Sequence, residues 1–277
     1  MEKNITEKAA ATEKRKFRIG FSRKQLCIPY GLFLALFVVM PLLLIVFYAF
    51  TDQNGTFSFD NFVRFFTSTT TISTLIISML IALATTVICI IIAYPVAYIL
   101  ARSNLNKGGT LLMLFIMPMW INFVLRAMAM KDLLTLIGVF GFNNYVNVII
   151  GMVYDYLPFM ILPIYNSVSV IDKSLLEASS DLGASKIKTF FKVILPLTKS
   201  ALFNGSLMVF TPALGYFFIV DILGGGKIMI LGNLIKNQFL TARNWPFGAS
   251  ISVFLLLITG LIIGVYRKTG GKMEDVG

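Results

Sequence analysis

A single carboxylate inside an apolar stretch is the side chain whose type and position best indicate chemistry in this sequence. Asp155 lies between Tyr154 and Tyr156 in the segment Val-Tyr-Asp-Tyr-Leu. An acid at membrane depth is costly and usually faces a cavity, a counter-ion or a ligand. Tyrosine rings beside it can hold a cation against their faces, worth about 0.5–2 kcal/mol each. These three residues could therefore contact an organic cation on its way through a membrane.

The sequence leaves two other positions open for Asp155. The carboxylate could pair with an internal Lys or Arg, or it could lie near the outer membrane interface. Three residues are weaker candidates for the same path. Trp120 follows a helix break, Tyr216 lies at a kink and Asp221 lies at a helix end. Arg126 would repel a cation, so we expect it to pair with Asp132 or to bind a delivery protein.

Motifs for catalysis are incomplete. The segment Gly224-Gly225-Gly226-Lys227 resembles the end of a phosphate-binding loop, but Asp221 stands where that loop needs its first Gly. The chain has no His, and its two cysteines, Cys27 and Cys89, lack metal-binding spacing. We expect no enzyme activity, no metal site and no bound cofactor, so any ATP with its Mg²⁺ would belong to another subunit.

The elements that position these residues are apolar runs of membrane length. The chain has 277 residues, is 57% hydrophobic and has a mean hydropathy of +0.83. Runs of about 20 apolar residues cross a bilayer core of about 30 Å, and they must be helical because lipid offers the backbone no partners. We predict an all-α membrane protein with six transmembrane helices. The predicted spans are residues 27–50, 72–101, 109–130, 147–170, 194–220 and 248–266.

Charge gives the predicted orientation. The net charge is +11, and with six spans 18 of the 24 Lys and Arg residues fall on one side of the membrane. The positive-inside rule makes that side cytoplasmic, with both chain ends on it. The basic excess thus reflects topology and excludes nucleic-acid binding as its explanation. We expect cytoplasmic tails at 1–24 and 268–277 around one transmembrane domain, residues 25–267.

Two segments assigned to the outer side are unusual for plain loops. Residues 51–71 contain five phenylalanines, which we interpret as an aromatic belt at the membrane interface or as contact with an external partner. Residues 221–247 are so apolar that we expect a short helix or a re-entrant hairpin there.

A polar, basic segment between the fourth and fifth runs has the pattern of two short amphipathic helices. Leu175, Ala178, Ser179 and Leu182 share one face of the first helix. The second carries an apolar stripe at the spacing i, i+3, i+4, i+7, formed by Ile187, Phe190, Phe191 and Ile194. Gly183 suits a left-handed or tight connection, and Pro196 suits the first turn of the next helix. We expect a helix–turn–helix elbow over residues 172–194.

This elbow resembles the cytoplasmic loop of bacterial ABC importer permeases. That loop has the pattern Glu-Ala-Ala, three residues, Gly, nine residues, then Ile-x-Leu-Pro, and the match is formed by Glu177, Ala178, Gly183, Leu195 and Pro196. Ser179 replaces the second Ala and Val193 replaces the Ile. The resemblance implies a MetI-like permease fold in the plasma or inner membrane of a bacterium. Its elbow, with Ala184 beside its Gly, would dock on an ATP-hydrolysing subunit. Glu177 would be an ion-pair partner there, or it could close a capping box begun by Ser174.

Further segments resemble the B-type permeases of spermidine/putrescine importers. They are Gly151–Tyr154, Leu157–Met160, Asp172–Ala178, Ile230–Lys236 and Arg243–Ala249, and with the elbow the similarity covers most of residues 26–267. It implies import of polyamines by a complex with a second, C-type permease, two ATP-binding subunits and an extracytoplasmic polyamine-binding protein. A permease of the same fold for sulfate, iron or thiamine remains an alternative, as does a channel or secondary carrier, which would not need the elbow.

Overall fold

The computed structural model describes residues 23–103 and 109–268, and these are almost entirely helical. The extended pairing within these ranges is one isolated antiparallel bridge, Thr51 with Phe57. The predicted tails at 1–24 and 268–277 lie almost wholly outside the described residues. The chain forms two units, residues 1–45 and 46–277, which we take in turn.

The first unit is one apolar helical rod. It consists of α2 (Arg23–Leu34), a π-helical segment η1 (Ala35–Val39) and the start of α3 (Met40–Ala49). Large apolar side chains are exposed all around it; Phe33, Phe37 and Leu43 are 55–67% exposed. A helix that is apolar on every face is suited to lipid, and Cys27–Ala49 is long enough to cross a membrane.

The second unit adds three unbroken helices of membrane length. They are α5 (Thr69–Arg102), α8 (Asn144–Ser169) and, within α15 (Trp245–Lys268), the stretch Trp245–Val265. With the rod of the first unit, four helices among the described residues are long and apolar enough to span a membrane.

Two bent helix pairs raise that number to as many as six. The predicted third span is Thr110–Trp120 (α6, Thr110–Ile116, with η3, Met117–Trp120) followed by α7 (Phe123–Leu136), at an angle of 99°. The predicted fifth span is Lys186–Leu197 followed by α12 (Lys199–Ala213), at 69°. Both runs are therefore bent: the third is broken after Trp120, where the sequence indicated a helix break, and the fifth bends at Thr198, before the kink expected near Pro212. At the first break Pro118 lies in the 3-10 turn, and the side chain of Asn122 restarts the helix by accepting from the Val124 N–H at 2.8 Å.

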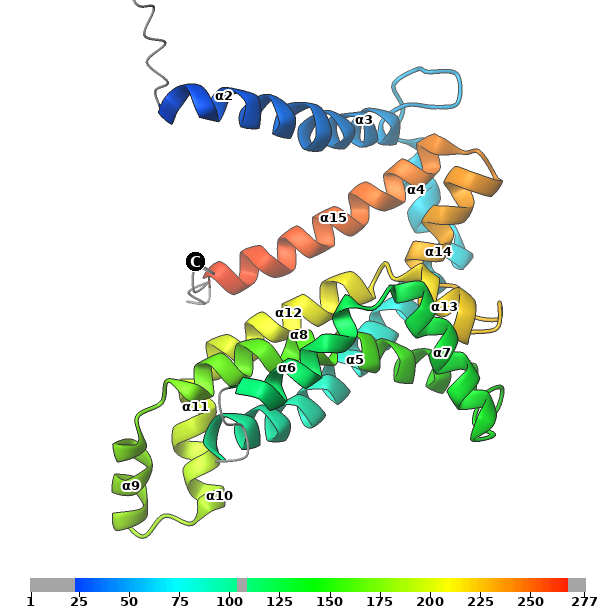
Figure 1. Cartoon of the computed structure of the whole chain (residues 1–277). Coiled ribbons are helices and arrows are strands. Elements are labelled where there is room, and N and C mark those ends of the chain that lie inside the picture. Colours follow the sequence, from blue (N-terminus) through cyan, green and yellow to red (C-terminus); the bar gives the residue numbers. More distant parts are fainter. Residues whose placement is uncertain (1–22, 104–108, 269–277) are drawn as a thin grey trace, which may run out of the picture. The chain divides into compact units, whose positions relative to one another are not determined.

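The core of the second unit lies where α5, α8 and α12 run side by side (Figure 1). Small side chains allow this close approach: Ala82, Ala93 and Ala97 of α5 are fully buried. A Cβ on Gly205 of α12 would lie 2.8 Å from the sulfur of Met160 in α8, so glycine at this position lets the two helices approach closely. The result is a compact three-helix centre of the second unit.

The apolar segment after α12 forms short helices, as predicted. α13 (Phe217–Leu223) is followed by α14 (Leu231–Lys236) and a π turn, η5 (Asn237–Thr241). α14 is buried: Leu231 donates its N–H to Ser78 Oγ of α5 at 2.8 Å, and a Cβ on Gly232 would collide with the Gly215 carbonyl. Backbone contact of this kind fixes the segment to the bundle.

The phenylalanine-rich segment 51–68 is divided between core and surface. Phe65, in α4 (Asp60–Thr67), is buried against Phe254 with ring centroids 4.3 Å apart. Phe57 and Phe59 are exposed and pack edge to face on each other; Phe57 stacks on Phe50, and Phe59 meets Phe50 edge to face. The expectation that all five rings lie at an interface was wrong for Phe65, because the amphipathic α4 buries one face.

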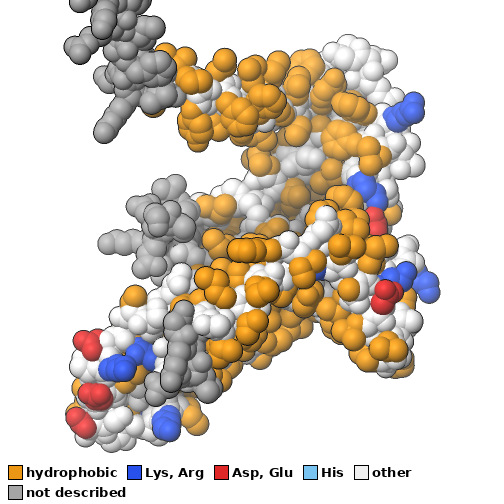
Figure 2. All heavy atoms as spheres, viewed as in Figure 1, with side chains coloured by type: hydrophobic (Ala, Val, Ile, Leu, Met, Phe, Trp, Pro, Cys, Tyr) orange, Lys and Arg blue, Asp and Glu red, His pale blue; other side chains and the backbone are white. Residues whose placement is uncertain are grey.

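Charged side chains gather at two ends of the second unit, with an apolar surface between them (Figure 2). One end is formed by the short helices α9 (Lys173–Asp181) and α10 (Lys186–Thr189), and the other lies near α7 and α14. This is the distribution expected of a protein with two aqueous ends and a lipid-facing middle.

Candidate functional site: a two-helix elbow and a buried polar cluster

The elbow predicted at residues 172–194 is two short helices joined by a tight turn. α9 begins at Asp172, whose carboxylate accepts the N–H of Ser174 at 3.0 Å. This hydrogen bond to its charged form lowers the pKa of Asp172. The capping box predicted from Ser174 to Glu177 is therefore wrong, because the helix starts two residues earlier. Glu177 is exposed, and its carboxylate has no hydrogen bond or ion pair with any described residue.

Gly183 makes the turn between the two helices. Its φ is +73°, a left-handed conformation that favours glycine, as predicted. Ser185 then caps α10 by accepting the N–H of Lys188 at 3.3 Å. The hydroxyls of Ser179 and Thr189 lie 2.8 Å apart and bond α9 to α10. The two helices are thus held together as one small unit.

The second arm of the elbow continues further than predicted. α10 leads through a π segment, η4 (Phe190–Ile194), into α11 (Leu195–Leu197), and the bend follows at Thr198. Pro196 therefore lies near the end of this arm and not in the first turn of the next helix. Thr198 is fully buried, and its hydroxyl is bonded to Tyr94 of α5 and to the Ile194 carbonyl. These contacts fix the base of the elbow to the core.

The apolar stripe on the second arm is split between the bundle and the surface. Phe190 packs edge to face on Tyr94 at 5.0 Å, and Ile194 is buried. Ile187 and Phe191 instead are 72% and 60% exposed, and Leu182 at the turn is 87% exposed. Large apolar side chains exposed in this way are typical of a segment that docks on another protein.

A second candidate is a buried polar cluster in the bundle. Asp155 of α8 is 3% exposed; its Oδ2 accepts the Tyr216 hydroxyl at 2.8 Å, and its Oδ1 lies 3.3 Å from Nη2 of Arg126 in α7. The second contact is an ion pair without hydrogen-bond geometry, and Nε and Nη1 of Arg126 are buried without hydrogen-bond partners among the described residues. Of the three positions considered for Asp155, namely a cargo path, an internal ion pair and the membrane interface, the contact with Arg126 is that of an internal ion pair.

Arg126 is the residue of this cluster whose partner was mispredicted. It pairs with Asp155, and not with Asp132 as expected. Tyr156 packs beside the cluster, with its ring centroid 5.5 Å from that of Tyr216. Three of the six candidate path residues, Asp155, Tyr156 and Tyr216, are thus brought together.

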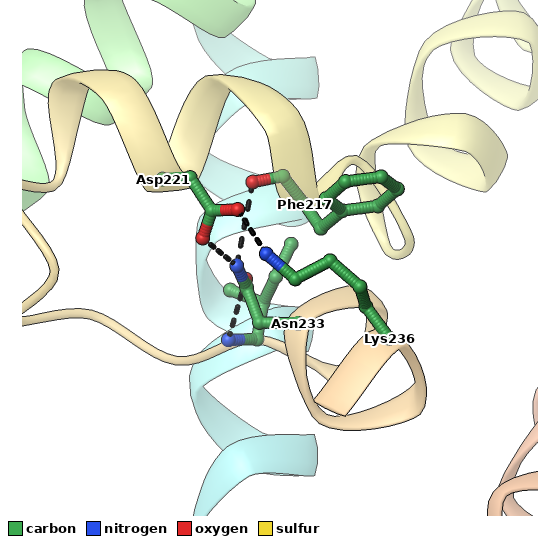
Figure 3. A network of polar contacts seen from close by, with 5 residues as sticks. Phe217, Asp221, Asn233 and Lys236 are labelled. Atoms are coloured by element: carbon green, nitrogen blue, oxygen red, sulfur yellow. Dashed lines mark hydrogen bonds and ion pairs between the residues drawn. The ribbon is translucent and has the colours of Figure 1, made fainter. Parts of the chain in front are cut away.

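The other three candidates lie elsewhere. Tyr154 is 38% exposed and Trp120 is 86% exposed. Asp221 belongs to a separate network in which Asn233 bonds one carboxylate oxygen and Lys236 the other (Figure 3). Asn233 also accepts the Ile230 N–H and donates to the Phe217 carbonyl. Both oxygens of Asp221 already have partners, and the network locks α13 to α14.

Comparison with known proteins identifies the family. Residues 93–268 match the family model described as "Binding-protein-dependent transport system inner membrane component". The chain belongs to this family. It is a multi-pass inner-membrane permease of the ABC importer type, and not an enzyme, because ATP hydrolysis in such transporters belongs to a partner subunit.

Individual relatives match over most of the permease. It is 37% identical over 258 residues to the "Spermidine/putrescine transport system permease protein PotB" of Escherichia coli (strain K12), covering 85% of this chain and 93% of the relative. The protein of the same name from Haemophilus influenzae is 40% identical over 198 residues, covering 66% and 69% of the two chains.

Solved structures support the MetI-like fold. A bacterial alginate ABC transporter, in complex with an alginate-bound periplasmic protein, matches with a TM-score of 0.68 at 14% identity, over 92% of this chain and 95% of that chain. The MetNI methionine ABC transporter in an inward-facing conformation matches with a TM-score of 0.55 at 18% identity, over 72% and 93% of the chains.

Proposed function

We propose that this permease imports polyamines, of the spermidine and putrescine type, as one subunit of an ATP-driven transporter. The observation that carries the proposal is the similarity to permeases named for spermidine and putrescine, which extends over 93% of a relative's length. The alternatives of another solute, or of a channel, have no comparable support.

The partners follow from the same proposal. A second, C-type permease would complete the path, two ATP-binding subunits would bind ATP and Mg²⁺, and an extracytoplasmic binding protein would deliver the polyamine. The elbow end and both chain termini would be cytoplasmic, which agrees with the excess of Lys and Arg predicted on that side.

The elbow is the proposed contact with an ATP-binding subunit. Its docking surface would be Glu177 and Ala178 on α9, Gly183 and Ala184 at the turn, and Leu195 and Pro196 at the far end. Because Glu177 has no partner among the described residues, its carboxylate is available for a basic side chain of that subunit. The attachment of Thr198 to Tyr94 gives a rigid route from the elbow into α5.

The proposed cargo path passes the polar cluster. Tyr156 and Tyr216 supply ring faces there, and Asp155 holds the Tyr216 hydroxyl in place. Tyr154, Trp120 and Asp221 would be peripheral to it, because the first two are exposed and Asp221 is engaged by Lys236.

The test is uptake of labelled spermidine by cells that lack their own polyamine importers. The permease would be expressed with the ATPase, permease and binding-protein genes beside its own. We expect ATP-dependent uptake that vanishes when this chain is omitted. An assembled complex that takes up no spermidine or putrescine would refute the substrate, while the family assignment would stand.

A further inference from the structure

A cavity of about 490 Å³, wide open to the surface, lies where α12 ends and is lined by residues of α8, α12, α14 and α15. The rings of Tyr156 and Tyr216 line it, together with three hydroxyl side chains, Thr211 of α12 and Ser252 and Thr259 of α15. Its volume is within the range of about 300–1,000 Å³ that holds small ligands. Nothing in the family assignment gives these hydroxyls a role.

Two of the three hydroxyl groups, those of Ser252 and Thr259, already donate their protons within α15. Ser252 donates its proton to the Gly248 carbonyl at 2.9 Å, and Thr259 donates to the Leu255 carbonyl at 2.9 Å. A hydroxyl that donates within its own helix keeps lone pairs that can only accept. Ligand groups that bring N–H donors therefore suit these positions better than groups that bring acceptors.

The electrostatic setting also favours a cation. Thr211 and Pro212 lie in the last turn of α12, whose carbonyls carry the partial negative charge of a helix C-terminus. Tyr156 and Tyr216 line the cavity, aromatic rings attract cations, and Tyr216 is held by its bond to Asp155. Lys and Arg are not among the residues that line the cavity.

We propose that this cavity is a transient binding site for an alkylammonium group of the cargo. The inference rests on the proposed function and adds the place and chemistry of recognition within this subunit. The buried charge of Asp155 is already balanced by Arg126, so the cavity attracts the ammonium through hydroxyl oxygens, ring faces and the helix end. A site without a formal negative charge binds weakly, which allows the cargo to leave and continue along the path.

The first test removes the hydroxyls without changing the shape of the side chains. In the complete transporter, the pair Thr211→Val and Thr259→Val should lower spermidine uptake at limiting concentration about tenfold, because hydrogen bonds to a charged group are lost. Ser206→Ala is the matched control, since Ser206 is a half-buried residue of α12 that bonds its own helix backbone outside the cavity. Uptake equal to that of the control in an assembled complex would overturn the site.

The second test detects occupancy and does not depend on uptake. In a Cys27→Ser background, Ser252→Cys places a thiol in the cavity and Ser206→Cys places one outside it. During turnover, spermidine should slow modification of the first thiol by a cationic thiol reagent about threefold or more, but not of the second. An uncharged diol of similar length should not protect. Absence of protection by spermidine, or equal protection by the diol, would overturn the proposal.

The outcomes separate this site from the proposed function. If the wild-type complex takes up no polyamine, the function itself fails. If the wild type takes up spermidine while the hydroxyl variants match the control and Ser252→Cys is not protected, only the site fails. If the hydroxyl variants do not assemble, the protection experiment decides alone.

Discussion

At the scale of single residues, the Arg126–Asp155 pair is the feature with the largest energetic consequences. Both side chains are at least nine-tenths buried, and they join α7 to α8. Such a pair adds little net stability, but removing one partner costs about 3–5 kcal/mol because the other charge stays buried and unpaired. The pair therefore fixes how α7 and α8 pack together. A single substitution at either residue should mainly change the stability of that packing.

A neutral double substitution distinguishes a structural pair from a cargo ligand. Asp155→Asn alone and Arg126→Gln alone should each lower the melting temperature and the yield of the assembled complex. The combination of Asp155→Asn with Arg126→Gln should restore both, together with most spermidine uptake, because no buried charge is left unpaired. Restored assembly with uptake still near zero would instead mean that the Asp155 carboxylate itself contacts the cargo.

The sequence predicted part of this cluster and missed the rest for a physical reason. An acid among apolar residues can be recognised in the sequence, and so can the tyrosines beside it. Its partners are not, because Arg126 is 29 positions before Asp155 and Tyr216 is 61 after it. Whether they meet depends on the break before α7 and on the end of α12, and neither the angle of a bend nor the rotation of a helix follows from composition.

At the scale of elements, the segment after α8 forms two short helices, α9 and α10, joined at Gly183. Its two helices and the left-handed Gly183 follow from local rules, namely amphipathic spacing and the φ requirement of a tight turn. The predicted capping box and the position of Pro196 failed because Asp172 competes as a cap and a π segment carries the second arm past the proline. Where two nearby residues could each cap or end a helix, tertiary packing decides which of them does so, and the sequence alone does not show this.

Substitution of Glu177 tests what the elbow does. Glu177→Ala should leave α9 folded, since Asp172 supplies the cap and exposed substitutions usually cost less than about 0.5 kcal/mol. It should weaken retention of the ATP-binding subunit about tenfold, as expected for loss of one partner from a charge pair at an interface. Co-purification of the ATP-binding subunit at increasing salt concentration measures this retention.

Asp181→Ala, at the exposed end of the same helix, is the control. Equal retention in the two variants would exclude Glu177 from the contact.

At the scale of the whole molecule, the second unit has two chemically different ends separated by the length of α8. α8 has 26 residues and is about 39 Å long at a rise of about 1.5 Å per residue, which exceeds a bilayer core of about 30 Å. The turn after α13 packs against the beginning of α8, where Gly224 lies beside Val148. The elbow follows the last residues of α8. The two ends should therefore face opposite sides of the membrane.

Labelling from one side tests this arrangement and its direction. In a Cys27→Ser background, with Cys89 buried, single cysteines would replace two exposed residues, Ser180 in α9 and Lys227 after α13. A membrane-impermeant maleimide should label Lys227→Cys in spheroplasts, and Ser180→Cys only in inverted vesicles, because the basic elbow end is retained in the cytoplasm. Labelling of both from one side would refute the span assignment. The reverse pattern would put the elbow outside, where it could not meet an ATP-hydrolysing subunit, and would remove the coupling role with it.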